Sequence, residues 1–220
     1  MSDGHPADPA TGTVLLDLPF RGRWRVENSP ARRVPSHGTS ALGTAYAIDF
    51  VPVGDADRSA PRTWRRLVAP EPPELFVGFG RPVLAPLPGT VVLTHDGEDD
   101  HDARRSPVTL VPYGLGQGRR VRSGVPAVAG NHVVIAAGAH GPYVLLAHLR
   151  RGTVGVRPGQ AVRAGDPVGG CGNSGNSTEP HVHVQVCDST EWHVARGLPL
   201  AFRGRTGAAW VPAEGEIVEA

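Results

Sequence analysis

Two histidines stand two positions apart in the Val-rich run Asn176-Ser-Thr-Glu-Pro-His-Val-His-Val-Gln-Val. In a strand, alternate side chains point to opposite faces, so His181 and His183 share one face while the valines fill the other. Zinc sites need neutral imidazoles that are held rigidly, and a strand supplies that rigidity. The structural alternative is a pair of surface or hydrogen-bonded core histidines, so other parts of the chain must support a metal site.

Three further residues carry suitable chemistry. His148 lies in YVLLAHL, where alternation places it on the face of Val144 and Leu146. Asp49 lies in the apolar run YAIDFV, where a buried carboxylate is costly unless a cation or a donor meets it. His37 opens the Gly/Ser/Thr-rich segment before that run. Two histidines and a carboxylate form a standard catalytic zinc set, and the spare histidines suit acid–base work.

The composition of the 220 residues excludes several classes of function. All 22 basic residues are Arg, which rules out a lysine nucleophile, a Schiff base and lysine-linked lipoyl or biotinyl groups. A net charge of +1 gives no electrostatic reason to expect a nucleic-acid partner. The chain contains neither His-Glu-x-x-His nor Gly-x-Ser-x-Gly. We expect Cys171 and Cys187 to be free, partly buried thiols.

The start of the chain lacks the basic residues and apolar run of a signal peptide, and no apolar stretch approaches the ~18 residues of a membrane span. We therefore expect no membrane span and a cytoplasmic location. An extracellular or cell-wall location is the alternative if the protein leaves by another route or if its start lies upstream.

Short runs of β-type residues, separated by Gly- and Pro-rich turns, predict an all-β sandwich or barrel with few short helices. We expect a leader over residues 1–12, one domain over 13–205 with insertions at about 54–74 and 95–128, and a tail over 206–220. The expected strands cover residues 13–20, 23–27, 45–53, 83–93, 131–137, 143–149, 154–156, 161–162, 167–170 and 181–186.

Five motifs resemble, in this order, those of the lysostaphin-type (LytM-like) zinc endopeptidases: HGTSALGTAYAIDF, NHVVI, YVLLAHL, VRPGQAVRAGDPVG and GNSGNSTEPHVHVQV. The resemblance covers residues 37–50 and 82–187, with the two insertions between. It implies a two-sheet β groove, built from a duplicated hybrid motif, with one zinc ion at its floor. By the same resemblance, His37, Asp49 and His183 are the zinc ligands, and His148 and His181 are the unligated catalytic histidines.

The chain departs from the family pattern at two places. The family's first ligands stand four residues apart as His-x-x-x-Asp, whereas His37 and Asp49 are twelve apart. Either a loop is inserted between them, or another group is the ligand. Glu179 stands where the family often has Gly, and it adds a charge at the edge of the groove.

The resemblance implies a zinc endopeptidase that hydrolyses peptide bonds, with cell-wall peptidoglycan or a related peptide as substrate. A non-catalytic module that binds zinc and a peptide or partner is the main alternative. A phosphotransferase carrier of similar fold would not require Asp49 or two adjacent same-face histidines.

The remaining polar groups have structural explanations. We expect His132 to be a strand residue near the groove rim, and the acidic loop 95–102 to be solvated rather than a second metal site. The aromatic residues Trp64, Tyr113 and Trp192 are candidates for lining the groove.

Overall fold

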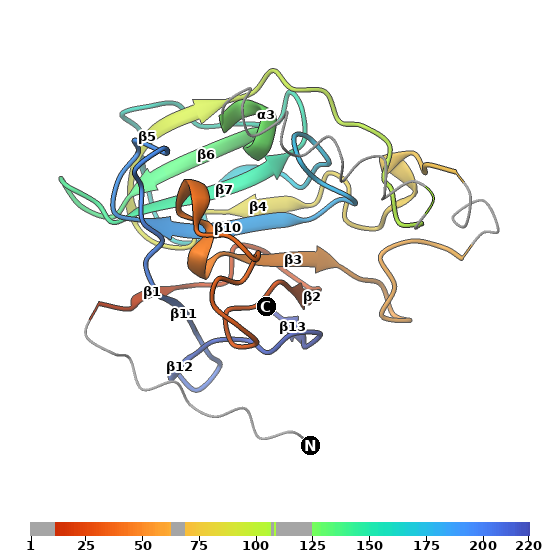
Figure 1. The fold of residues 1–220 in the computed structure, drawn as a ribbon, viewed down its shortest axis with the longest axis horizontal. Helices are drawn as coiled ribbons and strands as arrows, with labels where there is room; N and C mark the ends of the chain where they lie inside the picture. Colours follow the sequence, from red (N-terminus) through yellow and green to blue (C-terminus); the bar gives the residue numbers. More distant parts are fainter. Residues whose placement is uncertain (1–11, 63–68, 107, 109–124) are drawn as a thin grey trace.

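An eight-stranded antiparallel sheet dominates the computed structural model, which describes residues 12–62, 69–106, 108 and 125–220 (Figure 1). Its strand order is β13-β2-β3-β10-β7-β6-β5-β8. The strands are β2 (Arg23–Glu27), β3 (Ile48–Pro52), β5 (Gly89–His95), β6 (Asn131–Ala136), β7 (Tyr143–Leu149), β8 (Ala161–Val162), β10 (Val182–Cys187) and β13 (Ile217–Glu219).

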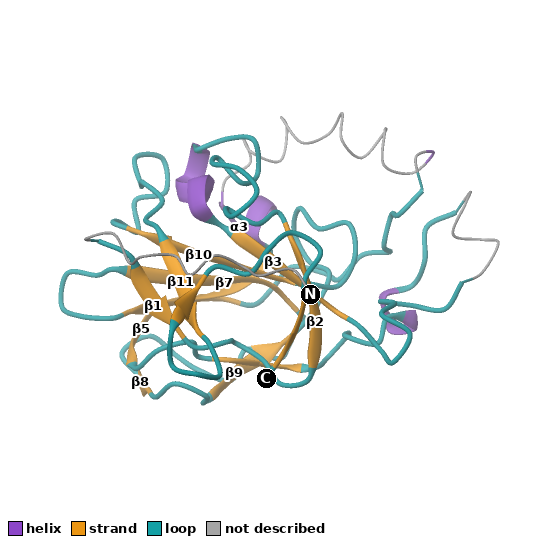
Figure 2. Ribbon diagram, turned by 90° about the horizontal axis from the view of Figure 1, so that it is seen from below, coloured by secondary structure: helices purple, strands orange, loops and turns teal. Residues whose placement is uncertain are grey.

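Two smaller sheets accompany the large one. One has the order β1-β11-β12, and the other pairs β4 with β9. These strands are β1 (Val14–Leu16), β11 (Leu200–Arg203), β12 (Ala209–Trp210), β4 (Pro82–Leu84) and β9 (Pro167–Gly170). Short helical segments are η1 (Ala41–Tyr46), η3 (Pro73–Leu75) and α3 (Val125–Ala129), as Figure 2 shows. Within the described residues, no helix has the length and apolar character needed to cross a membrane.

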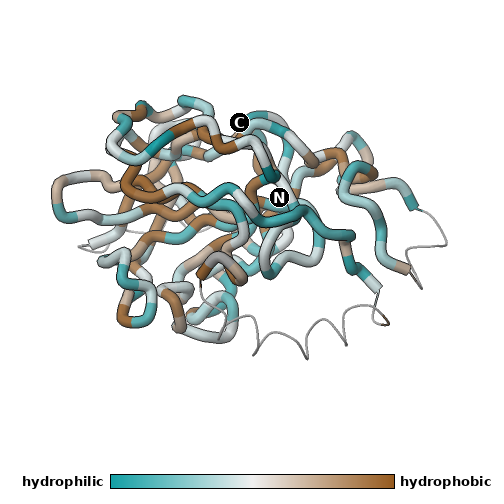
Figure 3. The backbone as a smooth tube through the Cα atoms, turned by 90° about the horizontal axis from the view of Figure 1, so that it is seen from above, coloured by the Kyte–Doolittle hydropathy of each residue, from teal (hydrophilic) through white to brown (hydrophobic). Residues whose placement is uncertain are grey.

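The main hydrophobic core lies between the large sheet and the two small ones. Alternate residues of β2, β3, β7 and β10 point into it and meet apolar side chains of the small sheets. Phe50 of β3 contacts Phe202 of β11 edge to face, with ring centroids 5.3 Å apart. Each fully buried side chain of this size stabilises the fold by roughly 1.5–3 kcal/mol. Figure 3 shows apolar residues concentrated along the strands of this interior. The opposite face of the large sheet is therefore free to carry polar groups.

Most predicted strands are confirmed, and the all-β class with few short helices is confirmed with them. The bounds of β2 and β7 agree with those predicted from the sequence. The structure has three sheets rather than two, and residues 154–156 form no strand. The expected tail contains β12 and β13, and β13 pairs with β2 at the edge of the large sheet. Such short strands carry too little alternation to be recognised locally.

The remaining domain limits stay predictions. The leader lies outside the described residues except for Gly12, and the two insertions are described only in part. Cys171 and Cys187 are free and buried, as predicted. Burial raises the pKa of the Cys187 thiol to about 11 and raises that of Cys171 further. Neither thiol is poised to act as a nucleophile at neutral pH.

Candidate metal and catalytic centre

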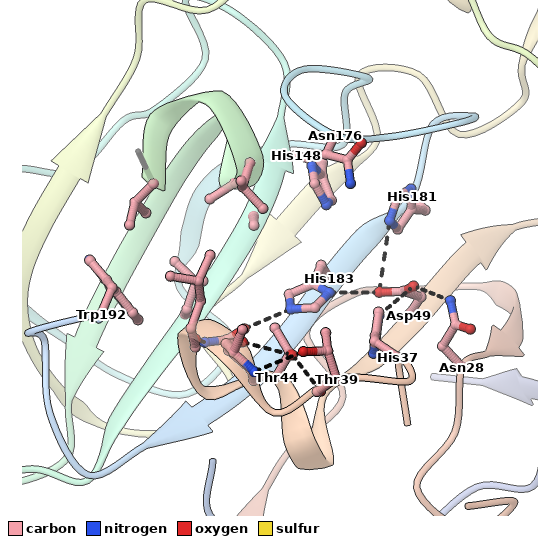
Figure 4. Close-up of a pocket in the computed structure, with 18 of the residues that line it drawn as sticks. Asn28, His37, Thr39, Thr44, Asp49, His148, Asn176, His181, His183 and Trp192 are labelled. Atoms are coloured by element: carbon pink, nitrogen blue, oxygen red, sulfur yellow. Dashed lines mark hydrogen bonds and ion pairs between the residues drawn. The ribbon is translucent and has the colours of Figure 1, made fainter. Parts of the chain in front are cut away.

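His37, Asp49 and His183 converge on the polar face of the large sheet (Figure 4). Asp49 of β3 stands directly opposite His183 of β10 in the antiparallel register. The His183 Nδ1 atom lies 2.9 Å from Asp49 Oδ1, and the His37 Nε2 atom lies 3.0 Å from Asp49 Oδ2. One potential ligand atom from each residue lies within 4.8 Å of the other two. All three side chains therefore reach a volume that one ion can occupy.

The twelve-residue separation between His37 and Asp49 is closed by a folded loop. Its chain turns through η1, where Leu42 and Gly43 adopt left-handed backbone angles. A backbone hydrogen bond of 2.9 Å from Ser36 N to Ala45 O joins the two ends of the loop. The longer spacing is thus an insertion that brings His37 back to Asp49.

The hydrogen bonds around His37 determine which of its two ring nitrogens carries the proton. The Ser36 hydroxyl donates to the Thr44 carbonyl at 3.3 Å, so its oxygen accepts from His37 Nδ1 at 3.0 Å. Nδ1 therefore carries the proton in the neutral ring. The Nε2 lone pair is then directed toward the Asp49 carboxylate.

His183 is oriented in the same way by Gln185. The Gln185 Nε2 group donates to the Leu42 carbonyl at 2.9 Å, which leaves its Oε1 atom to accept from His183 Nε2 at 2.9 Å. The proton of the neutral ring is thus held on Nε2, and the Nδ1 lone pair faces Asp49. Outer partners that hold a histidine in one tautomer are typical of metal ligands.

The Asp49 carboxylate stays ionised although it is only 6% exposed. Burial on its own would raise its pKa, but the neighbouring His37, His181 and His183 rings outweigh burial and hold the pKa well below its usual range. The Asn28 side-chain amide donates to Oδ2 at 2.8 Å.

Lone pairs from two neutral imidazoles and a carboxylate meet at one point, which is stable only with a cation between them. Nitrogen and oxygen ligands about 2.0–2.1 Å from a tetrahedral zinc ion lie roughly 3.3 Å apart, close to the separations at Asp49. The donor set therefore fits zinc. Asn28, Ser36 and Gln185 were not identified from the sequence as supports of this site. Gln185 was recognisable in principle, because it shares the face of His181 and His183 by alternation.

We expect Gln185→Leu to weaken zinc binding by about 10- to 100-fold, the usual cost of losing an outer hydrogen-bond partner of a metal ligand. The leucine cannot accept from His183 Nε2, so the ring is free to change tautomer or rotate. Competition with a chromogenic chelator measures the affinity. Gln160→Leu, in the turn before β8, is the matched control and should bind zinc like the wild type. An unchanged affinity in Gln185→Leu would contradict this role.

His148 reaches the polar face through a bulge in β7. Asn131 of β6 pairs with Leu149, but Val133 pairs with Leu146, so one β6 residue lies opposite two residues of β7. His148 has a φ of 61°, in the left-handed region that non-glycine residues seldom adopt. Bulges of this kind redirect side chains beside active sites.

The bulge overturns the alternation predicted for this strand. Val144, Leu146 and Leu149 all pack in the main core, while Leu145 and Ala147 lie on the opposite face. The prediction that His148 shares the face of Val144 and Leu146 is therefore wrong. The reversal at His148 places its ring beside His181, with centroids 4.6 Å apart.

His148 and His181 both hold a proton on Nδ1 and direct Nε2 toward the site. His148 Nδ1 donates to the Ser174 carbonyl at 2.9 Å, and His181 Nδ1 donates to the Glu179 carbonyl at 2.8 Å. Burial, with added repulsion from His181 and His183, holds the pKa of His148 well below its usual range. His148 is therefore neutral at pH 7, and its Nε2 atom carries no proton. The His181 Nε2 atom lies 3.8 Å from Asp49 Oδ1.

A groove of about 370 Å³ contains all five residues and extends beyond them over an apolar surface. That surface comes from β7, from α3 and from Trp192, which lies away from the charged groups in Figure 4. Trp192 thus lines the groove as expected, whereas Trp64 and Tyr113 lie outside the described residues.

The other polar groups singled out in the sequence have structural partners. His132 is 2% exposed, is paired with His95 between β6 and β5, and donates from Nδ1 to the Gly130 carbonyl at 2.7 Å. The Asp96 carboxylate accepts backbone N–H groups of Gly152 and Val154 at 2.7 and 3.1 Å. The acidic loop is thereby attached to the chain around residue 152. Within the described ranges, His37, Asp49 and His183 are the single cluster with metal-ligand geometry.

Residues 74–196, more than half of the chain, match the family described as peptidase family M23. The chain belongs to peptidase family M23. Members of M23 are zinc metallopeptidases, so the family and the donor set agree on the metal. The matched range includes His148, His181 and His183, whereas His37 and Asp49 precede it and join the site only through the fold. The resemblance identified from the motifs is confirmed.

The chain is also similar to individual peptidases. The peptidoglycan DD-endopeptidase ShyA of Vibrio cholerae serotype O1 is 32% identical over 109 residues, which cover 50% of this chain and 22% of ShyA. This chain thus spans only a minor part of the length of ShyA. The catalytic domain of lysostaphin from Staphylococcus simulans gives a TM-score of 0.38 at 19% identity, with coverage of 69% and 74%. A zinc-containing peptidase from Vibrio cholerae gives a TM-score of 0.31 at 18% identity, with coverage of 64% and 46%.

Proposed function

We propose that this M23 chain is a zinc-dependent endopeptidase that hydrolyses peptide bonds in peptidoglycan or a related peptide. The observation that carries the proposal is the convergence of His37, Asp49 and His183 beside two unligated, buried histidines. A site that only bound zinc would need the first three residues but would have no use for the other two. The relationship to a peptidoglycan endopeptidase supports the substrate class.

His37 Nε2, an Asp49 oxygen and His183 Nδ1 would hold the zinc ion. Bound there, zinc would lower the pKa of a water molecule to about 7 and would polarise the carbonyl oxygen of the substrate. Ser36, Gln185 and Asn28 keep the three ligands in position and in the required protonation states.

His148 and His181 would carry the proton transfers of the reaction. A neutral His148 can take a proton at Nε2, since its Nδ1 proton is held by Ser174. His181 is held in the equivalent tautomer by Glu179. Once protonated, either ring can donate to the oxyanion or to the leaving amine. No glutamate is required as a general base in this arrangement.

Metal analysis combined with product analysis tests this function. We expect one zinc per chain, release of soluble peptide fragments from purified peptidoglycan, loss of release with a zinc chelator, and recovery when zinc is restored. Mass spectrometry of the fragments identifies the bond that is cleaved. Stoichiometric zinc with no new amine or carboxyl termini in any peptide would overturn the endopeptidase and favour the zinc-binding module.

A further inference from the structure

A second cavity, of about 280 Å³, lies next to the groove, and four of its eight lining residues are arginines. No step proposed above uses it. Its charged lining residues are the arginines Arg25, Arg58, Arg62 and Arg105 and the carboxylates Asp57 and Glu179.

The strand register places this cavity along the same sheet face as the metal site. Glu27 of β2 pairs with Asp49 of β3, and Arg25 pairs with Val51. Asp49 and Val51 are alternate residues on one face, about 7 Å apart along the strand. The cavity also shares a wall with the catalytic centre, because the Glu179 carbonyl accepts the Nδ1 proton of His181. An extended peptide that crosses the metal site toward the carboxyl end of β3 would reach the second cavity about two residues beyond the metal site.

Two of the arginines are already neutralised. Arg105 forms two hydrogen bonds to Glu71, of 2.9 and 2.8 Å, and its guanidinium lies 4.7 Å from the centre of the Phe76 ring. Arg25 donates twice to Glu27, at 3.1 and 2.8 Å. These pairs form fixed walls of the cavity and add little net charge.

Arg58 and Arg62 carry the excess positive charge. Both are exposed, and neither forms an ion pair with any residue in the described part of the chain. The lining also holds two carboxylates: Asp57, which pairs with Arg23 at 2.6 Å, and Glu179, which accepts from the Ser59 hydroxyl at 2.5 Å. Burial raises the pKa of Glu179, against the effect of that hydrogen bond. The cavity therefore presents two unneutralised guanidinium groups to a ligand.

The opposite arm of the groove has different chemistry. Leu145 and Ala147 of β7, Val125 of α3 and Trp192 line it, and no arginine lies among its lining residues. The metal site thus separates an apolar arm from a cationic arm. Such a surface distinguishes the two ends of a substrate, because each arm accepts only one kind of side chain.

We propose that Arg58 and Arg62 bind a free carboxylate of the peptide substrate, while the apolar arm holds a small apolar side chain across the scissile bond. This inference rests on the proposed function and narrows its substrate to peptides that carry a carboxylate near the cleaved bond. Guanidinium groups bind carboxylates through paired, charge-assisted hydrogen bonds, which fixes the orientation of the peptide as well as its affinity.

Binding and cleavage of one substrate in two chemical forms test the proposal. The probes are soluble peptidoglycan fragments with native carboxylates and the same fragments with carboxylates converted to amides. Titration calorimetry on the zinc-loaded protein measures binding, and mass spectrometry measures cleavage. We expect about five- to tenfold tighter binding of the native form, as befits two exposed charge contacts. Arg58→Gln/Arg62→Gln should abolish that preference and leave binding of the amidated form unchanged.

Arg157→Gln/Arg163→Gln, which removes the same charge around β8, is the matched control and should keep the preference. Equal or undetectable binding of the two forms by the wild type would contradict the proposal that Arg58 and Arg62 bind a substrate carboxylate. A preference for the native form that survives in the Arg58→Gln/Arg62→Gln variant would also contradict it. Preferential binding of the native form without any cleavage would support carboxylate binding by Arg58 and Arg62 and would contradict the proposed endopeptidase activity. The two proposals therefore fail separately.

Discussion

Asp49→Asn is expected to lose both zinc and peptidase activity. The substitution keeps the size of the side chain but removes the charge on which His37 and His183 converge at 3.0 and 2.9 Å. Losing an outer partner of a ligand costs about 10- to 100-fold in metal affinity, so loss of a ligand itself should cost at least about 100-fold. Zinc per chain after dialysis, chelator competition and release of peptide fragments are the measurements.

The apoprotein provides an internal check on this variant. The Asn amide can donate to one of the imidazole lone pairs that face it, so metal-free Asp49→Asn should unfold at or above the temperature of the metal-free wild type. Asp17→Asn, which alters an exposed aspartate paired with Arg203 at 3.1 Å, is the control and should retain zinc and activity. Wild-type zinc affinity in Asp49→Asn would show that another group completes the ligand set.

His148→Ala is expected to separate zinc binding from catalysis. The His148 ring lies 5.8 Å from that of His183 but forms no hydrogen bond to His183, Asp49 or His37, and its Nδ1 is held by Ser174 at 2.9 Å, so zinc affinity should change little. Removal of a general acid–base group should lower kcat by about 10²- to 10⁴-fold. Steady-state kinetics on a purified peptide fragment, with parallel metal analysis, gives both numbers.

His148→Gly distinguishes the chemical role of the ring from the strain of its backbone. Glycine adopts a φ of 61° freely, whereas alanine keeps the left-handed strain. We expect the Gly variant to be as inactive as the Ala variant but more stable by about 1 kcal/mol in urea unfolding. Loss of zinc from the Ala variant, to the same extent as from Asp49→Asn, would refute the catalytic assignment of His148.

Local alternation of residue types was sufficient to locate the strands that carry the site. The bounds of β2 and β7, the placement of His181 and His183 away from the buried valines, and the isolation of Asp49 in an apolar strand all follow from a two-residue period. The motif resemblance then selected the five residues His37, Asp49, His148, His181 and His183. In each case the signal lies within a few residues of the group concerned.

Features that depend on distant parts of the chain could not be predicted from local alternation or from motifs. The short strands β11, β12 and β13 exist because of the partners they pair with, and two to four residues carry no distinctive period. The bulge at His148 depends on the register between β6 and β7, which alternation within β7 cannot reveal.

The metal centre itself is decided by tertiary structure. The spacing of residues in the sequence cannot show whether the loop between His37 and Asp49 brings its two ends together. In the structure, a backbone hydrogen bond from Ser36 N to Ala45 O joins them. Asn28, just after β2, hydrogen-bonds to Asp49, and Gln185 of β10 hydrogen-bonds to His183. The excess charge of Arg58 and Arg62 becomes apparent only when the acidic partners of Arg25 and Arg105 are known. Side-chain direction is a local property of the backbone, whereas coordination and charge balance depend on which distant groups come within about 3 Å of each other.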